Sequence, residues 1–168
     1  AGSYTSPGTI IAPESGFYTW VWAIDKDAHG EQAKYLTDSF TDRFGQVAET
    51  SVVPFQPVAV SEADQRLAIP GDALTDTITV SSSNGAWLKK DGAWMLVVLG
   101  GTAYQVPGAL QPDVKAVIDG NAVPLGTVTV TADGPGVYTS PSVIAPSGGF
   151  VTWVWEVKKV SQPEWVRD

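Results

Sequence analysis

The sequence predicts an all-β protein built as an antiparallel β-sandwich and cut from a tandem array. Runs dense in β-branched and aromatic residues are separated by Gly and Pro turn signals about every ten residues, a spacing typical of sandwiches. A motif of 18 residues occurs twice, once near each end of the chain. The 168 residues include no cysteine, which excludes disulfides, zinc–thiolate sites and thiol catalysis.

The repeated motif defines the predicted organisation. Residues 4–22 read YTSPGTIIAPESGFYTWVW and residues 138–155 read YTSPSVIAPSGGFVTWVW, with 13 of 18 positions identical after one insertion. The copies lie 134 residues apart at the tyrosine and 133 at the tryptophans, far beyond the period of about 20 to 50 residues in solenoids. We interpret residues 1–50 as the tail of a preceding repeat and residues 51–168 as most of the next. One domain with two similar hairpins is the alternative.

Strands are expected wherever β-branched and aromatic residues concentrate. In chain order these are residues 17–24, 52–60, 74–80, 94–99, 114–118, 126–132 and 150–157. The segment 74–80 alternates in polarity, which places four side chains on one face: Leu74, Asp76, Ile78 and Val80. Gly100-Gly101 reads as a turn after the fourth strand. Residues 25–42 lack a sustained helical period, so we expect a loop with at most a short helical turn.

Charge and hydropathy exclude two classes of partner. The net charge is −8 and the pI about 4.4, and no basic stripe exists to displace counterions from a phosphate backbone. We therefore predict no nucleic-acid partner and no binding to an anionic membrane surface. Apolar runs are only a few residues long, well short of the roughly 20 that span a bilayer, and no leader-like N-terminus is seen.

Catalytic and metal-binding patterns are missing. The single histidine, His29, excludes a two-histidine metal site. Asp25-x-Asp27-x-His29 is similar to the opening of a calcium loop, but Leu36 stands where the closing glutamate belongs. The carboxylate pairs of this acidic chain, such as Asp72 with Asp76, read as solvated faces unless a deep cleft joins them. We predict no metal, no cofactor and no enzymatic activity.

Tryptophan is the residue type that points to binding. Trp87 and Trp94 flank the turn Lys89–Gly92, where we expect partial exposure, and with Trp165 they are the candidates for ligand contact. The paired rings of Trp20 and Trp22, like those of the second copy, lie on one face of a strand. The favoured interpretation of these pairs is sandwich core, the alternative a platform for sugar rings.

Three stretches resemble the stalk repeats of Gram-positive, actinobacterial cell-wall-anchored surface proteins and adhesins. They are residues 48–53 (AETSVV), 70–80 (PGDALTDTITV) and 149–156 (GFVTWVWE). The resemblance covers about residues 50–168 and implies an immunoglobulin-like sandwich. Ser61-Glu-Ala-Asp64 stands where the family has T-x-A-x-D, and Glu156 matches its closing glutamate.

Many repeats of this kind carry a spontaneous intramolecular isopeptide or ester crosslink assisted by a buried acid. The resemblance makes four residues crosslink candidates: Ser61, Glu156, Glu49 and Thr50. The chain departs from the family in having Ser for Thr at position 61 and Glu for Gln at position 49. A closing strand for the second repeat would begin after Asp168, so residues 39–50 would complete that sandwich, from within the chain or by strand exchange between chains.

The expected function is mechanical. The resemblance implies an extracellular spacer on the cell surface, whose partners are neighbouring repeats and which holds a distal binding domain away from the cell wall. The alternative is a module that binds carbohydrate or a host protein through exposed tryptophans.

Overall fold

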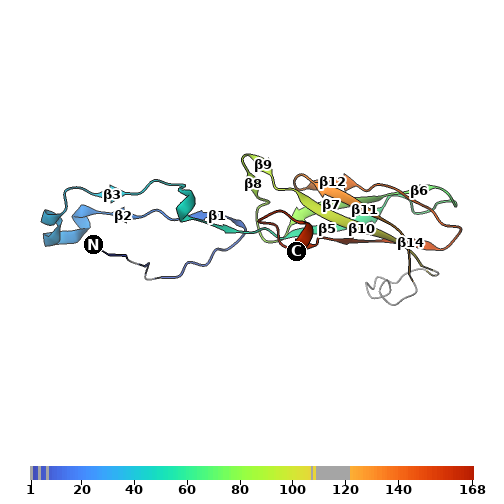
Figure 1. The fold of residues 1–168 in the computed structure, drawn as a ribbon, viewed down its shortest axis with the longest axis horizontal. Helices are drawn as coiled ribbons and strands as arrows, with labels where there is room; N and C mark the ends of the chain where they lie inside the picture. Colours follow the sequence, from blue (N-terminus) through green and yellow to red (C-terminus); the bar gives the residue numbers. More distant parts are fainter. Residues whose placement is uncertain (1, 4, 7, 107, 109–121) are drawn as a thin grey trace.

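The computed structural model describes residues 2, 3, 5, 6, 8–106, 108 and 122–168, and it is an elongated β structure (Figure 1). The all-β prediction is confirmed, and the strand pairs are antiparallel. The strands are β1 (Gly16–Thr19), β2 (Ala23–Ile24), β3 (Phe40–Thr41), β4 (Thr50–Val53), β5 (Pro57–Ala63), β6 (Ala73–Leu74), β7 (Asp76–Ser82), β8 (Lys89–Lys90), β9 (Ala93–Trp94), β10 (Val97–Val106), β11 (Val123–Ala132), β12 (Gly136–Thr139), β13 (Val143–Ile144) and β14 (Phe150–Glu156). Three 3₁₀ segments accompany them: η1 (Lys26–Tyr35), η2 (Val47–Glu49) and η3 (Lys159–Ser161).

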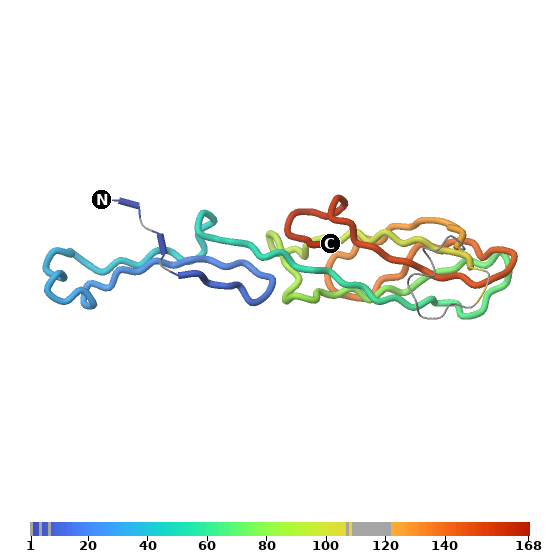
Figure 2. The backbone as a smooth tube through the Cα atoms, turned by 90° about the horizontal axis from the view of Figure 1, so that it is seen from below, coloured from blue at the N-terminus to red at the C-terminus, as the bar shows by residue number. Residues whose placement is uncertain are grey.

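The N-terminal part is a long two-stranded arrangement, which we call the ladder (residues 14–53). β1 pairs with β4, β2 pairs with β3, and η1 forms the far tip. The two halves of the ladder run side by side, and no second sheet of the described residues packs on them, as Figure 2 shows. Large apolar side chains are therefore left in solvent, including Phe40 and Phe44.

The described residues of the range 54–168 form the body, which lies end to end with the ladder (Figures 1 and 2). One sheet has the strand order β12-β7-β5 and the other β11-β10-β14, with two short pairs, β13-β6 and β8-β9, beside them. The second copy of the repeated motif supplies β12, β13 and β14, so it contributes strands to both main sheets. No helix in the described residues is long and apolar enough to cross a bilayer.

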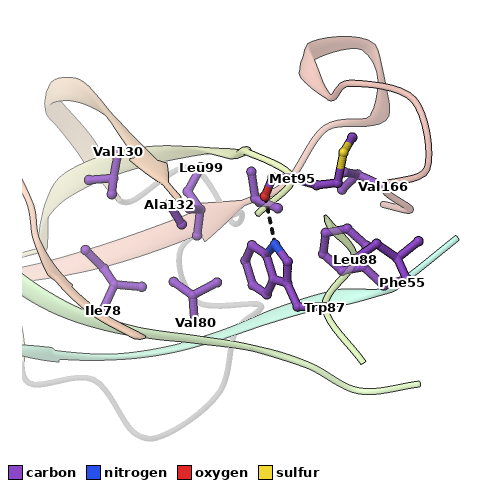
Figure 3. Packing of buried hydrophobic residues seen from close by; sticks show 11 residues of the cluster. Phe55, Ile78, Val80, Trp87, Leu88, Met95, Leu99, Val130, Ala132 and Val166 are labelled. Atoms are coloured by element: carbon purple, nitrogen blue, oxygen red, sulfur yellow. Dashed lines mark hydrogen bonds between the residues drawn. The ribbon is translucent and has the colours of Figure 1, made fainter. Parts of the chain in front are cut away.

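The core of the body lies between the two main sheets. Alternate residues of β7 and β10 are buried there. In β7 the buried face carries Ile78 and Val80, as the alternation of apolar and polar residues in the sequence predicted. Figure 3 shows these two side chains pointing toward Leu99 and Val130, with Trp87 between Val80 and the pair Leu88 and Phe55. Each fully buried aliphatic side chain contributes about 1.5–3 kcal/mol through removal from water, so this layer holds the two sheets together.

A buried polar contact crosses the same space. Asp76 is only 1% exposed, and its Oδ2 accepts a hydrogen bond of 2.7 Å from Nε1 of Trp155. The backbone N–H of Asp76 donates to Oγ of Ser140, and the Ser140 N–H donates to the Asp76 carbonyl. The indole of Trp155 lies directly over Gly101, where a Cβ would come within 2.6 Å of the ring. Strands from both sheets are thus tied to one carboxylate.

Two expectations about element boundaries are wrong. Gly100-Gly101 is no turn but the middle of β10, because the absent side chain at Gly101 makes room for Trp155. The strand expected at 52–60 is interrupted, since Pro54 lies where the chain passes from the ladder to the body. The strand expected at 114–118 lies outside the described residues. The loop expected at residues 25–42 is more ordered than predicted, because it contains the 3₁₀ segment η1, which is broken at Gly30 (φ 55°), and the strand β3, which pairs with β2.

We expect Asp76→Ala to lower the free energy of unfolding by about 1–3 kcal/mol, because the indole N–H of Trp155 loses its acceptor in the core. Asp76→Asn is the matched control, since its side-chain oxygen still accepts that hydrogen bond and a smaller loss follows. Urea unfolding followed by tryptophan fluorescence measures both. Equal stability of Asp76→Ala and the parent would show that this contact does not support the core.

Candidate functional site

The ladder and the body meet in a compact contact that we call the joint. Ser15, at the start of the ladder, is buried, and its N–H donates to the Asn84 carbonyl at 2.7 Å. Its hydroxyl donates to the Ala86 carbonyl at 2.6 Å. Gly85 lies between these two acceptors with φ +122°, and a Cβ there would lie 2.7 Å from Cβ of Glu14. The loop at residues 84–86 therefore fits the ladder only with glycine at its centre.

Asn84 also holds the chain segment that links the two parts. Its Nδ2 donates to the Pro54 carbonyl at 3.0 Å, and its Oδ1 accepts from the Gln56 N–H at 2.6 Å. One asparagine side chain thus fixes the backbone on both sides of Phe55. The sequence analysis did not identify Asn84 or Ser15, because their role depends on a loop and a turn that are distant in the chain.

The C-terminal segment closes the joint from the other side. The backbone carbonyl of Trp165 accepts a hydrogen bond from the Phe55 N–H at 3.1 Å, and the backbone N–H of Arg167 donates to the Phe55 carbonyl at 2.9 Å. The Trp165 ring meets Phe17 of the ladder edge to face, with ring centres 5.2 Å apart. Trp165 has φ +73°, a conformation that costs a bulky residue free energy and is held here by these contacts. The linker between ladder and body is consequently not a free hinge.

The ladder presents an exposed aromatic pair. Trp20 and Trp22 are stacked, with ring centres 6.2 Å apart and planes at 17°, and they are 38% and 49% exposed. The corresponding residues of the second copy, Trp153 and Trp155, are stacked in the same way at 5.9 Å and 11°. In the body, Trp155 packs against the buried cluster that includes Ile78 and Leu99. Trp153 packs against a second buried cluster, which includes Leu74 and Ala103. The same local structure is therefore partly buried against the core in one copy and exposed in the other.

The three tryptophans proposed for ligand contact have different environments. The expected partial exposure of Trp87 is wrong: the ring is buried against Phe55, and its Nε1 donates to the Met95 carbonyl at 2.7 Å. Trp94 is 40% exposed, with Nζ of Lys89 4.0 Å from its ring centre. Trp165 belongs to the joint and lines an apolar groove of about 410 Å³ together with Phe17.

The four crosslink candidates are spread over both parts of the molecule. Ser61 lies exposed on β5 opposite Ile78, whereas Glu156 lies on β14 opposite Gly100 and forms an ion pair of 2.5 Å with Lys158. Among the described residues no hydrogen bond joins Ser61 to any of the other three.

The other two candidates lie in the ladder. Thr50 Oγ1 donates to the Gln46 carbonyl at 2.8 Å. A hydrogen bond with Asp42, partial desolvation and repulsion from the same carboxylate raise the pKa of Glu49. Residues 39–50 do not complete the sheet of the body from within the chain, because their strands pair with β1 and β2.

Asp64, the last residue of the Ser61–Asp64 pattern, has a structural role in the body. Its two carboxylate oxygens accept hydrogen bonds of 2.6 Å from the hydroxyls of Thr75 and Thr77. These two hydrogen bonds hold the pKa of Asp64 below its usual value. The carboxylate thus fastens the end of β5 to β7 in its ionised form.

Comparison of the chain with protein-family models, with curated proteins and with solved structures finds no match. Within the ranges that the structure describes, no group of three or more His, Cys, Asp or Glu residues is gathered as a metal site requires. The joint and the exposed Trp20–Trp22 pair are the two features of the chain from which a function can be proposed.

We expect Gly85→Ala to loosen the joint, because the added Cβ collides with Glu14 and Ser15. Gly71→Ala is the matched control: Gly71 also has a positive φ, +95°, but nothing lies within 4 Å of its Cβ position. Residual dipolar couplings report the orientation of the ladder relative to the body. They should change in Gly85→Ala and not in Gly71→Ala, and an unchanged orientation in both would contradict this role of the loop.

The intact mass of the folded chain is expected to equal the mass of its sequence. Ser61 and Glu156 are exposed on strands of different sheets, whereas a crosslink needs an apolar environment that activates the reacting groups. Mass spectrometry of the purified protein measures this directly. A deficit of one water or one ammonia would contradict the prediction, and peptide mapping would then identify the joined residues.

Proposed function

We propose that the chain is a stalk segment of an extracellular surface protein, in which immunoglobulin-like β-sandwich repeats follow one another and hold a distal binding domain away from the cell. In this proposal the body is one repeat, and the ladder is the second half of the repeat before it. No reaction on an external substrate is involved. Neighbouring repeats are the partners.

The observation that supports the proposal is that the two copies share a motif and its stacked tryptophan geometry but differ in environment. In the body, Trp153 and Trp155 are partly buried against core residues on strands that precede the second copy in the chain. In the ladder, Trp20 and Trp22 have the same stacked geometry but no such strands beneath them. A preceding half-repeat resembling residues 54–134 would supply the missing layer.

The joint suits a mechanical role. A spacer must transmit tension and resist folding back, which requires successive repeats to be held at a defined angle. Ser15, Asn84 and Trp165 together connect the ladder, the linker and the end of the body by hydrogen bonds and one aromatic contact. The elongated outline in Figures 1 and 2 agrees with repeats placed end to end.

A carbohydrate-binding module is the second candidate, and the exposed pair Trp20–Trp22 is the observation that favours it. Two nearly parallel indole rings, two residues apart between β1 and β2, offer a surface on which sugar rings stack. The matching pair in the body argues for the spacer, because there the same two rings pack against the core. One experiment distinguishes the two functions.

The test adds the missing half-repeat. A chain in which a copy of residues 54–134 precedes Ala1 keeps the spacing of the repeat, because Tyr138 and Tyr4 are 134 residues apart. We expect Trp20 and Trp22 to become buried in this longer chain, which shifts tryptophan emission to shorter wavelength and reduces acrylamide quenching. Pulling on its termini should then give two unfolding events of similar size in place of one.

The matched control carries Asp76→Ala in the added copy alone, which removes the acceptor equivalent to the one that binds Trp155. The first unfolding event should occur at lower force and the second should be unchanged. If Trp20 and Trp22 remain quenchable in the longer chain, the spacer proposal fails. Glycan binding that is lost in Trp20→Ala would then establish the second candidate.

A further inference from the structure

β14 forms one edge of the sheet β11-β10-β14, and its other side has no strand partner in the described part of the chain. Six consecutive residues of this strand, Phe150–Trp155, are uncharged and include no proline. Exposed sheet edges in soluble proteins are normally protected by charges, prolines or bulges, since unpaired N–H and C=O groups attract other strands. This edge lacks the usual protection.

The hydrogen bonds of β10 show which residues of β14 face outward. The N–H of Val98 donates to Oε1 of Gln162 at 2.9 Å, and the Val98 carbonyl accepts from Nε2 of Gln162 at 2.7 Å. The backbone groups of Val98 therefore point away from β11. Because hydrogen-bonding direction alternates along a strand, Thr102 and Tyr104 also face β14, opposite Val154 and Thr152.

The residues between these paired positions have their backbone groups turned the other way. Val151, Trp153 and Trp155 therefore direct their N–H and C=O groups to the open edge.

The ladder shows the same edge with its partner in place. Trp20, which corresponds to Trp153, donates its N–H to the Glu49 carbonyl at 3.0 Å. Trp22, which corresponds to Trp155, accepts a hydrogen bond of 2.8 Å from the Asp42 N–H. The backbone groups of β14 that face its open edge are thus equivalent to the groups that, in the first copy, form hydrogen bonds with the segment ending in β4.

We infer that the open edge of β14 is a docking site for an antiparallel strand of the β4 type, the sequence Glu-Thr-Ser-Val-Val of residues 49–53, supplied by the remaining part of the same repeat. This inference rests on the tandem arrangement of the proposed function. The pairing of Tyr18 with Ser51 in the ladder sets the register, which places Val151 opposite the residue equivalent to Ser51. A second copy of this chain is a poorer occupant, because its own β4 already pairs with β1.

The experiment appends a copy of residues 36–56 directly after Asp168, which preserves the spacing of 133 residues between the two copies. Amide hydrogen exchange measured by NMR is the readout. In the parent chain the amides of Val151, Trp153 and Trp155 should exchange fast, whereas those of Thr152 and Val154, which face β10, should be protected. In the longer chain the first three should slow by at least tenfold, and the last two should not change.

The control carries Ser51→Pro and Val53→Pro in the appended copy, which keeps its length but removes two of the N–H groups that would face β14. Its three edge amides should exchange as fast as in the parent. Fast edge amides in the unmodified longer chain would overturn the inference, as would equal slowing in the proline control. Edge amides that are slow in the parent and become faster on dilution would overturn it in favour of a second copy. None of these outcomes depends on the burial of Trp20 and Trp22, which tests the proposed function separately.

Discussion

The structure depends on one constraint: a strand face that carries large apolar and aromatic side chains needs a second sheet over it. In the body this second layer exists, and Trp155 illustrates it best. Its ring lies on Gly101 of β10, and its indole N–H donates a hydrogen bond to the side chain of Asp76 of β7. A single residue of β14 therefore joins both sheets, and the buried carboxylate is acceptable because it is paired.

The ladder shows what the same sequence becomes without that layer. The stacking of Trp20 on Trp22 is retained, because the two residues lie two positions apart on one face of the extended segment between β1 and β2. The burial is lost, because burial requires partner strands from elsewhere. Local geometry is thus encoded in the motif, and environment is supplied by whatever packs on it.

The two parts of the chain differ in what completes them. Among the described residues, the ladder has the pairing strand β4 but no second sheet over it, whereas the body has both sheets and an open edge at β14. The joint between the parts is specific, since the buried Ser15 and the glycine-dependent loop at residues 84–86 fit each other closely. The proposed spacer function rests on this complementarity between the two parts.

The all-β class, the duplicated motif and the inward face of β7 could be predicted from sequence, because they depend on local composition and on the two-residue period of a strand. The burial of Trp87, the place of Gly100-Gly101 inside β10 and the role of Asn84 could not, because each depends on a neighbour distant in the chain. Local patterns in the sequence specify most strands and the residues that share a face of each strand. Which of those faces and edges are covered follows from the packing of distant segments, which no local pattern specifies.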